Sequence, residues 1–306
     1  MRVAQEGAGA RIVNNLNAFY SSKYHSKLSV FPLVLALICL ASSCGGENPP
    51  EITPATLGGD RILFERGEAA LAEEDWGDAR GFFVQVRDNY PQSDFRADAR
   101  IGVADSYEGQ GGSVQYTSAL VEYEEFLRLY PTNPRADYAQ FKLALVHHHQ
   151  MREPERDQSW TQSAIEQFEL FLERFPNSDL IPQANTYLRE AKDRLSDSEY
   201  TVGQYYYRNE WWPGAIDRFE TIAESDPQYT RREALYFYLA DAHYNEGNFQ
   251  EALSFFQQLR DEFPQSLFLA DAQAAITDIE SQATDQTDGG QEAGDGSTEV
   301  ETQSPE

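Results

Sequence analysis

Five regularly placed prolines limit most strongly what this chain can fold into. They are Pro91, Pro131, Pro176, Pro227 and Pro264. Each follows an alanine by twelve residues, an aromatic residue by eight and a bulky apolar residue by five. Self-similarity at intervals of about 20–50 residues is typical of repeat architectures, in which each unit packs mainly on its neighbours. The pattern therefore predicts an array of five similar units.

The three positions before each proline are predicted to lie on one face of a helix. They are Ala79, Phe83, Val86; Ala119, Tyr123, Phe126; Ala164, Phe168, Phe171; Ala215, Phe219, Ile222; and Ala252, Phe256, Leu259. Steps of four and then three residues match the helical period. We expect the alanine to let a second helix approach, the aromatic ring to fill the groove beside it, and the proline to end the helix. Three prolines are followed two residues later by a serine (Ser93, Ser178, Ser266), which we expect to cap the next helix.

A partner helix is predicted upstream in each unit. A small residue stands twelve residues before the alanine at Gly67, Gly203 and Ala240. Extra residues around 110–112 and 149–157 predict insertions between the helices of the second and third units, and unequal proline spacings predict linkers of varying length. The units resemble tetratricopeptide repeats (TPRs). The sequence thus predicts an all-α fold of five TPR-like helical hairpins, stacked as a curved solenoid over residues 59–281, with a closing helix at 271–281.

The charge of the chain excludes two classes of partner. The sequence has 24 Lys and Arg against 51 Asp and Glu, a formal net charge of −27. Binding to the phosphates of a nucleic acid requires clustered basic residues. Electrostatic adhesion to an anionic bilayer requires them as well. We therefore expect neither interaction.

The N-terminal region has the layout of an export signal. Lys23 and Lys27 precede a short apolar run that is too short for a comfortable membrane span. Small residues then precede Cys44, as in a lipobox, where the cysteine is lipidated and becomes the first residue of the mature chain. An ordinary signal peptide that happens to contain a cysteine is the alternative. We expect residues 1–43 to be removed and residues 44–58 to form a lipidated cysteine and tether.

The C-terminal residues 282–306 differ in composition from the repeats. They contain seven carboxylates, no basic residue and no aromatic residue. Such a segment cannot bury enough apolar area to offset the entropy lost on ordering. The composition predicts an acidic disordered tail.

The sequence carries no motif for catalysis or metal binding. His147, His148 and His149 are consecutive, and neighbouring side chains on a helix point about 100° apart, so three in a row do not readily share one ion. There is no His-Glu-x-x-His motif, no phosphate-binding loop and no nucleophile elbow. The glycines at 109–112 are expected in a turn between helices. We therefore expect no enzymatic activity, no cofactor and no metal.

Several features together resemble one known family. They are the lipobox Cys44 with its proline-containing tether, the corners Tyr90-Pro91-Gln92-Ser93 and Phe175-Pro176-Asn177-Ser178, the triplet Arg156-Asp157-Gln158, and the segments 191–195, 199–206 and 215–219. With five repeats, the chain resembles the BamD family, the lipoproteins of the outer-membrane β-barrel assembly machine. In that family the C-terminal half of the array binds the periplasmic region of the barrel-shaped assembly protein, and the N-terminal half receives unfolded outer-membrane proteins.

The resemblance implies particular contact residues in this chain. Carried over, it implies that Arg218 contacts the assembly protein as a guanidinium reaching a carboxylate. Trp211 and Trp212 at a helix start are further candidates for partner binding. Candidates for binding unfolded substrates in the N-terminal half are Phe95, Tyr107 and Tyr116.

Each of these assignments has an alternative. Arg218 could instead pair within the chain with Asp217 or Glu220, and the two tryptophans could form a corner packed against Tyr207. The three N-terminal aromatic residues could be ordinary core residues. At the level of function, the alternative is a TPR scaffold lipoprotein that serves another envelope process, such as cell-wall synthesis or division.

Overall fold

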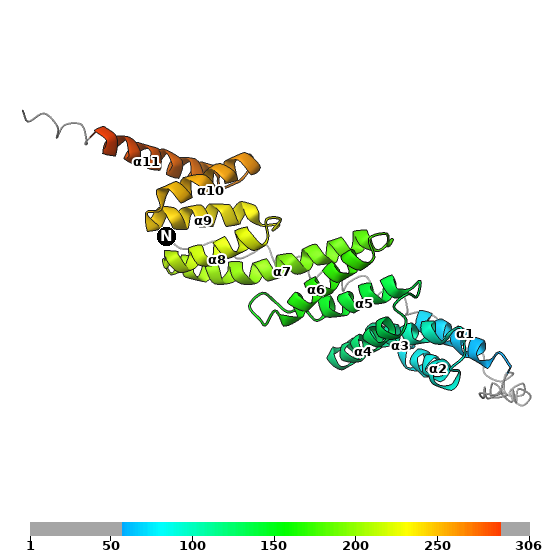
Figure 1. Cartoon of the computed structure of the whole chain (residues 1–306). Helices are drawn as coiled ribbons and strands as arrows, with labels where there is room; N and C mark the ends of the chain where they lie inside the picture. The colour runs from blue at the N-terminus through cyan, green and yellow to red at the C-terminus, as the bar shows by residue number, and fades with distance from the viewer. Residues whose placement is uncertain (1–56, 289–306) are drawn as a thin grey trace, which may run out of the picture. The chain divides into compact units, whose positions relative to one another are not determined.

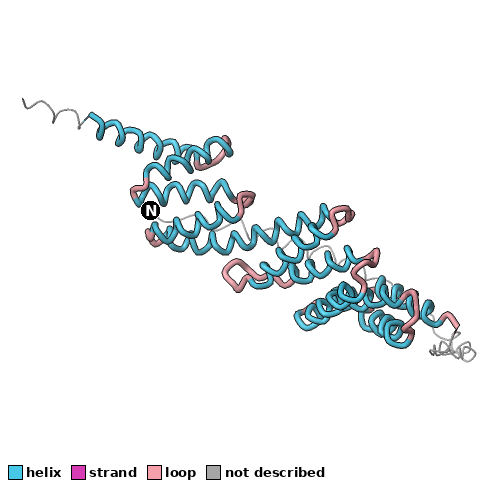
Figure 2. The backbone as a smooth tube through the Cα atoms, viewed as in Figure 1, coloured by secondary structure: helices cyan, strands magenta, loops and turns pink. Residues whose placement is uncertain are grey.

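The computed structural model describes residues 57–288, which form eleven α-helices and no β-strand (Figure 1, Figure 2). The helices are α1 (Gly59–Ala72), α2 (Trp76–Asn89), α3 (Arg96–Gln110), α4 (Ser113–Leu129), α5 (Ala136–His149), α6 (Ser159–Arg174), α7 (Ile181–Arg208), α8 (Trp212–Ser225), α9 (Arg232–Glu246), α10 (Phe249–Glu262) and α11 (Leu269–Asp288). The predicted all-α fold is confirmed for this part of the chain.

Helices adjacent in sequence pack against each other along the whole array, from α1 on α2 to α10 on α11 (Figure 1). Helices one hairpin apart also touch, as α1 does with α3 and α5 with α7. The helices therefore form five hairpins, α1–α2 to α9–α10, followed by α11. This is the nearest-neighbour packing expected of stacked helical repeats.

The alanine, aromatic and apolar positions that precede each of the five prolines form the core. All fifteen side chains in those columns have an exposed fraction of 1% or less. The ring of Phe83 lies between Gly67 of α1 and Gly102 of α3, and a Cβ at either glycine would come within 2.7 Å of the ring. Gly203 faces the ring of Phe219 in the same way, at 2.5 Å. Glycine is thus needed at these positions, because the aromatic ring from the second helix of a hairpin fills the space that a side chain of the neighbouring first helix would occupy.

The corners after the second helices confirm the role of proline but not that of serine. Each second helix ends two residues before its proline. Ser93 does not cap α3, whose N-cap residue is Phe95. Its hydroxyl accepts a hydrogen bond from the Phe95 amide at 3.1 Å and donates one to Asp60 of α1 at 2.6 Å. The capping prediction was wrong because the serine stabilises the turn itself and ties it to the preceding hairpin.

Two of the predicted irregularities are helical rather than looped. In the second hairpin the turn between α3 and α4 is only Gly111 and Gly112, and α4 has 17 residues where α2 has 14. The long interval between Pro176 and Pro227 is occupied by α7, a single helix of 28 residues, instead of a linker. A helix absorbs added residues by extending its hydrogen bonds, so no backbone groups are left unpaired. Only the third hairpin has the predicted insertion, a loop at 150–158.

The closing helix is longer than predicted. α11 packs on α10 through Ala272, Ile276 and Ile279, all of which are buried. It continues to Asp288, so residues 282–288 of the predicted disordered tail are helical. Gln282 donates a hydrogen bond to Asp278 one turn earlier, at 2.7 Å, which favours this extension.

Several predictions lie outside the described residues. They concern the export signal at 1–43, the lipid on Cys44, the tether before Leu57, and the tail at 289–306. Among the helices within 57–288, none has the length and apolar character needed to cross a membrane.

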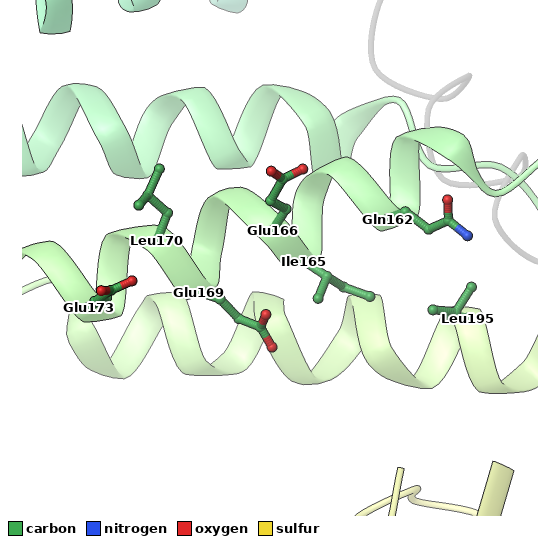
Figure 3. Close-up of a pocket in the computed structure, with 7 residues that line it drawn as sticks. All are labelled: Gln162, Ile165, Glu166, Glu169, Leu170, Glu173 and Leu195. Atoms are coloured by element: carbon green, nitrogen blue, oxygen red, sulfur yellow. The ribbon is translucent and has the colours of Figure 1, made fainter. Parts of the chain in front are cut away.

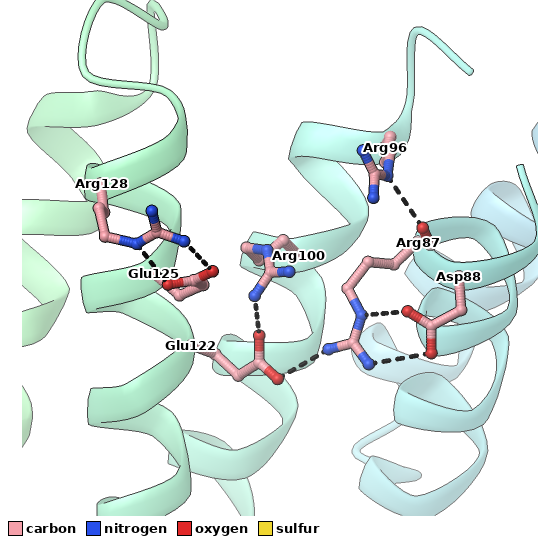
Figure 4. Close-up of polar contacts among 7 residues, drawn as sticks. All are labelled: Arg87, Asp88, Arg96, Arg100, Glu122, Glu125 and Arg128. Atoms are coloured by element: carbon pink, nitrogen blue, oxygen red, sulfur yellow. Dashed lines mark hydrogen bonds and ion pairs between the residues drawn. The ribbon is translucent and has the colours of Figure 1, made fainter. Parts of the chain in front are cut away.

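Charged side chains tie the first two hairpins together. Glu122 of α4 accepts hydrogen bonds from Arg87 of α2 and Arg100 of α3, each at 2.7 Å (Figure 4). The three side chains are only 15–17% exposed, and Arg87 also contacts Asp88 at 2.7 Å. One carboxylate thus joins three consecutive helices in a partly desolvated site, where such bonds are stronger than at an open surface.

A buried polar network joins the second hairpin to the third. The hydroxyl of Tyr123 on α4 lies 2.5 Å from Asp105 and 2.8 Å from Glu108, both on α3. From α5, Tyr138 donates a hydrogen bond to Asp105 at 3.1 Å and Lys142 forms an ion pair with Glu108 at 2.6 Å. Burial raises the pKa of Asp105 although the bond from Tyr123 and the charge of Lys142 act against it. The network therefore depends on its hydroxyl and ammonium donors.

Removing the hydroxyl of Tyr123 is expected to destabilise the fold. We expect Tyr123→Phe to lower the free energy of unfolding by about 1–3 kcal/mol, because the partly buried Asp105 and the buried Glu108 lose a shared donor. Urea unfolding followed by circular dichroism measures this. Tyr116→Phe is the control, because no hydrogen bond of the Tyr116 hydroxyl is found in the described structure; its effect should stay within about 0.5 kcal/mol. Equal effects of the two changes would contradict a stabilising role for the network.

Candidate functional site

Aromatic and apolar side chains are exposed where α7 ends and α8 begins. Tyr205 and Trp211 are 59% and 54% exposed, and Val202 is 38% exposed. We call the surface that contains them the α7–α8 patch, made of Glu199, Val202, Tyr205, Tyr206, Trp211 and Arg218. Large aromatic side chains left in solvent beside an arginine are typical of protein-binding surfaces.

Local geometry places these side chains side by side. Glu199, Val202 and Tyr206 follow one another at three- and four-residue steps and so share a face of α7. The chain then turns tightly, and the amide of Trp211 donates to the carbonyl of Tyr206 at 3.0 Å. The two rings meet edge to face, with centroids 4.5 Å apart. Gly214 permits this position, because a Cβ there would lie 2.6 Å from the indole.

Arg218 completes the patch on the α8 side. Its Nη1 lies 3.0 Å from Glu199 Oε2, and its Nε lies 3.7 Å from Asp217. The hydrogen bond to Glu199 raises the pKa of the Arg218 guanidinium. Of the two intramolecular partners considered from the sequence, Asp217 is near, whereas Glu220 faces His243 instead, at 3.3 Å. The Arg218 side chain is 39% exposed, and the guanidinium keeps donors that are available to an external carboxylate.

The two tryptophans have different environments. Trp212 packs inward, edge to face with Tyr207 at 5.5 Å, and adds to the core between α7, α8 and α9. This confirms the packing alternative for Trp212. Trp211 stays half exposed in the α7–α8 patch, so of the two it is the one available to a partner.

The three N-terminal candidates do not form one pocket. Phe95 at the start of α3 stacks on Phe64, with centroids 5.0 Å apart. Tyr107 lies under the guanidinium of Arg80, at 4.4 Å. The two are twelve residues apart on one helix, which separates them by about 18 Å. Phe95 and Tyr107 therefore cannot bind one substrate side chain together, whereas Tyr116 lines a separate cavity of about 360 Å³ at the α4–α5 surface.

The histidine run does not gather at one point. His147 lies against Trp160, His148 against Tyr187 and His149 against Tyr116, with centroids 5.6, 5.0 and 5.8 Å apart respectively. Burial lowers the pKa of all three imidazoles. Across residues 57–288, no group of three or more His, Cys, Asp or Glu side chains is placed to hold a metal ion.

Sequence reasoning missed Val202 and Tyr205 as surface residues. The run of three tyrosines at 205–207 was the available signal, since a helix cannot bury three consecutive side chains on one face. It did not show which of the three would be exposed, because that depends on the turn at 209–211. In the structure Tyr207 packs inward and Tyr205 points to solvent.

Fold and site together define a TPR-type helical repeat protein with an exposed aromatic patch. A tetratricopeptide repeat model matches residues 233–266, which hold α9 and α10. A second family model, described as outer membrane lipoprotein (YfiO), matches residues 59–248. The chain belongs to this family, which is the BamD family to which the sequence resemblance pointed.

The relatives are similar over most of their length. The outer membrane protein assembly factor BamD of Caulobacter vibrioides is 26% identical over 251 residues, covering 80% of this chain and 81% of the relative. BamD of Vibrio cholerae is 23% identical over 201 residues, covering 62% and 81%. Among solved structures, the TPR2AB-domain:pHSP90 complex of yeast Sti1 matches 75% of this chain and 86% of its own, with 12% identity and a TM-score of 0.40.

Proposed function

We propose that this protein is a non-enzymatic subunit of the machinery that assembles β-barrel proteins in the outer membrane. It is anchored by a lipid on Cys44 and faces the periplasm. It binds the periplasmic region of the barrel-shaped assembly protein and receives unfolded outer-membrane proteins. Membership of the YfiO family over residues 59–248 is the observation that carries this proposal, and the names of the relatives support it.

The α7–α8 patch is the proposed contact for the assembly protein. Trp, Tyr and Arg supply much of the binding energy at protein interfaces, and the patch exposes all three. Tyr206 holds Trp211 in one orientation, so little side-chain entropy is lost when a partner covers the indole. The complementary surface has an apolar hollow for Trp211 and a carboxylate that reaches Arg218.

The carboxylate on the partner is inferred from charge. The whole chain carries −27, so an exposed guanidinium is a local exception. Arg218 already contacts Glu199, and a second carboxylate would accept hydrogen bonds from the remaining N–H groups at the other edge of the guanidinium. For unfolded substrates, Tyr116 and its cavity of about 360 Å³ are the part of the N-terminal candidates best placed to hold a side chain.

Arg218→Ala is expected to weaken binding of the assembly protein about ten- to a hundredfold, as is Trp211→Ala. Trp211 is half exposed and Arg218 is partly exposed, so the melting temperature should change by less than about 2 °C. The first measurement is a mild-detergent pull-down of the lipidated protein with partners identified by mass spectrometry. Affinities of the variants for the recovered partner are then measured by biolayer interferometry.

Arg260→Ala is the matched control for this experiment. Arg260 is 48% exposed and contacts its neighbour Asp261 at 3.1 Å on α10, away from the patch. Its loss should leave the affinity unchanged. If the pull-down recovers only cell-wall or division proteins, the proposed role is wrong and the alternative of a TPR scaffold in another envelope process is supported. An Arg218→Ala variant that loses stability but keeps its affinity would remove Arg218 from the interface.

A further inference from the structure

The length of α7 leaves one place in the array without a helix. The first half of α7 packs on α5 and α6 through Ala184, Tyr187 and Ala191, as the first helix of a hairpin does. In the other hairpins the chain then turns back into a second helix. Here it continues, and the second half of α7 packs on α8 and α9 instead, through Tyr200. The first half of α7 therefore behaves as half a repeat, with no second helix of its own.

A groove runs along α6 and the first half of α7. We call it the α6–α7 groove and define it by Ile165, Glu166, Glu169, Glu173, Lys192 and Leu195. Figure 3 shows these side chains except Lys192. It consists of two adjoining hollows of about 400 and 260 Å³ that share Ile165, Glu169 and Leu195. The apolar side chains of Ile165 and Leu195 are only partly buried. The groove is therefore lined by apolar side chains along its base and by carboxylates along one side.

The cationic side chains of the protein neutralise only part of the negative charge of the groove carboxylates. Glu169 pairs with Lys192 of α7 at 2.7 Å. Glu166 and Glu173 are exposed, and neither forms an ion pair with another residue of the described structure. Steps of three and four residues place the three glutamates along one side of α6, one per turn. A binding partner therefore has to supply cations at the spacing of helical turns.

We propose that the α6–α7 groove seats an amphipathic helix of another protein, with lysine or arginine on the side facing α6 and apolar residues facing Leu195. A helix parallel to α6 matches the glutamate spacing, which an extended strand does not, because its side chains on one face recur about every 6.7 Å. The acidic C-terminal residues of this chain carry the wrong charge to fill the groove.

This proposal goes beyond the proposed function and uses a different surface. Glu166, Glu173 and Ile165 belong to the α6–α7 groove and not to the α7–α8 patch. Glu199 lines the second hollow and also pairs with Arg218, so it is left unchanged in the test. Loss of groove binding with intact assembly-protein binding, or the reverse, separates the two proposals.

The test uses a labelled helical peptide as a probe. The peptide has blocked ends and about four turns, with leucines on one face and lysines at the three- and four-residue spacing of the glutamates. Fluorescence anisotropy measures its binding to the full chain. We expect the double change Glu166→Gln and Glu173→Gln to weaken binding about five- to tenfold, and added salt to weaken binding to the unchanged protein.

The controls separate groove binding from general attraction to an acidic protein. Glu224→Gln with Glu251→Gln removes the same charge from exposed positions outside the groove and should change the affinity less than twofold. A peptide of the same composition in scrambled order should bind at least fivefold more weakly. Equal losses for the two double variants, or equal binding of the two peptides, would overturn the proposal. So would sedimentation that shows a dimer of this chain that the double change Glu166→Gln and Glu173→Gln dissociates.

Discussion

Replacing Phe83 by alanine is expected to lower the free energy of unfolding by about 3–5 kcal/mol. The ring is 1% exposed and lies between Gly67 and Gly102, so its loss opens a cavity with glycine on two sides. Neither glycine has a side chain that could move into the space. The cost should therefore fall at the upper end of the range for large-to-small changes.

Chemical denaturation and amide hydrogen exchange check this expectation. Because stability in a repeat array is largely a sum over neighbours, protection should be lost first in α1 to α3. Phe83→Leu fills most of the space and should cost about 1–1.5 kcal/mol. If the alanine variant lost no more stability than the leucine variant, the ring would not be the packing element that the glycines indicate.

Replacing Asp226 by alanine is expected to cost about 2–4 kcal/mol. In the other four corners an aromatic residue precedes the proline, whereas here Asp226 joins the end of α8 to α7. Arg189 binds both of its oxygens, with Nη1 at 2.9 Å from Oδ1, and Ser196 donates at 2.8 Å. The aspartate side chain is only 9% exposed. Its loss leaves Arg189 with only Asp193 as a partner, at 3.1 Å.

A double-mutant cycle with Arg189→Ala measures the coupling between the two side chains by urea unfolding. Asp261→Ala is the control, because Asp261 is 69% exposed and pairs with its neighbour Arg260; it should cost less than about 0.5 kcal/mol. Additive effects of Asp226→Ala and Arg189→Ala would contradict the pairing.

The contact between Asp226 and Arg189 makes the free energy of unfolding depend on pH. Burial favours the protonated form of Asp226, but hydrogen bonds from Arg189 and Ser196 outweigh it and hold the pKa of this carboxyl below its ordinary value of 3.8. The unfolded chain therefore takes up the proton first. The stabilisation is present above about pH 4 and is lost as the pH falls through the folded-state pKa. The Asp226→Ala variant should show a shallower loss of stability over this range.

The core could be predicted from the sequence because it repeats. A single apolar residue such as Phe83 is ambiguous, but the same residue class at the same distance from five prolines fixes both the helix face and the neighbour it meets. The serine corners were misassigned because Ser93 bonds to Asp60, 33 residues earlier, and a local capping rule considers only the next helix. Long-range partners of short polar side chains are not visible in local patterns.

The candidate site was only partly predictable for a related reason. The family resemblance implied Arg218, and Trp211 was a candidate as an aromatic residue at a helix start, but the exposure of the tryptophan ring depends on how the turn after α7 directs it. The sequence could not separate Trp211 from Trp212, which are adjacent and alike. Packing against Tyr207 buries one, and Gly214 leaves room for the other at the surface.

The continuity of α7 also restricts how the chain can vary in length. Each residue added within a helix turns everything beyond it by about 100° and moves it by about 1.5 Å. One inserted residue in α7 would therefore rotate α8 to α11 about the α7 axis relative to α1 to α6, and the α7–α8 patch would face a new direction. The loop at 150–158 could take up the same insertion without such a rotation. Insertions in homologous chains should therefore be frequent in that loop. Within α7, insertions should be restricted to lengths close to whole helical turns, which return α8 to the same angle about the α7 axis.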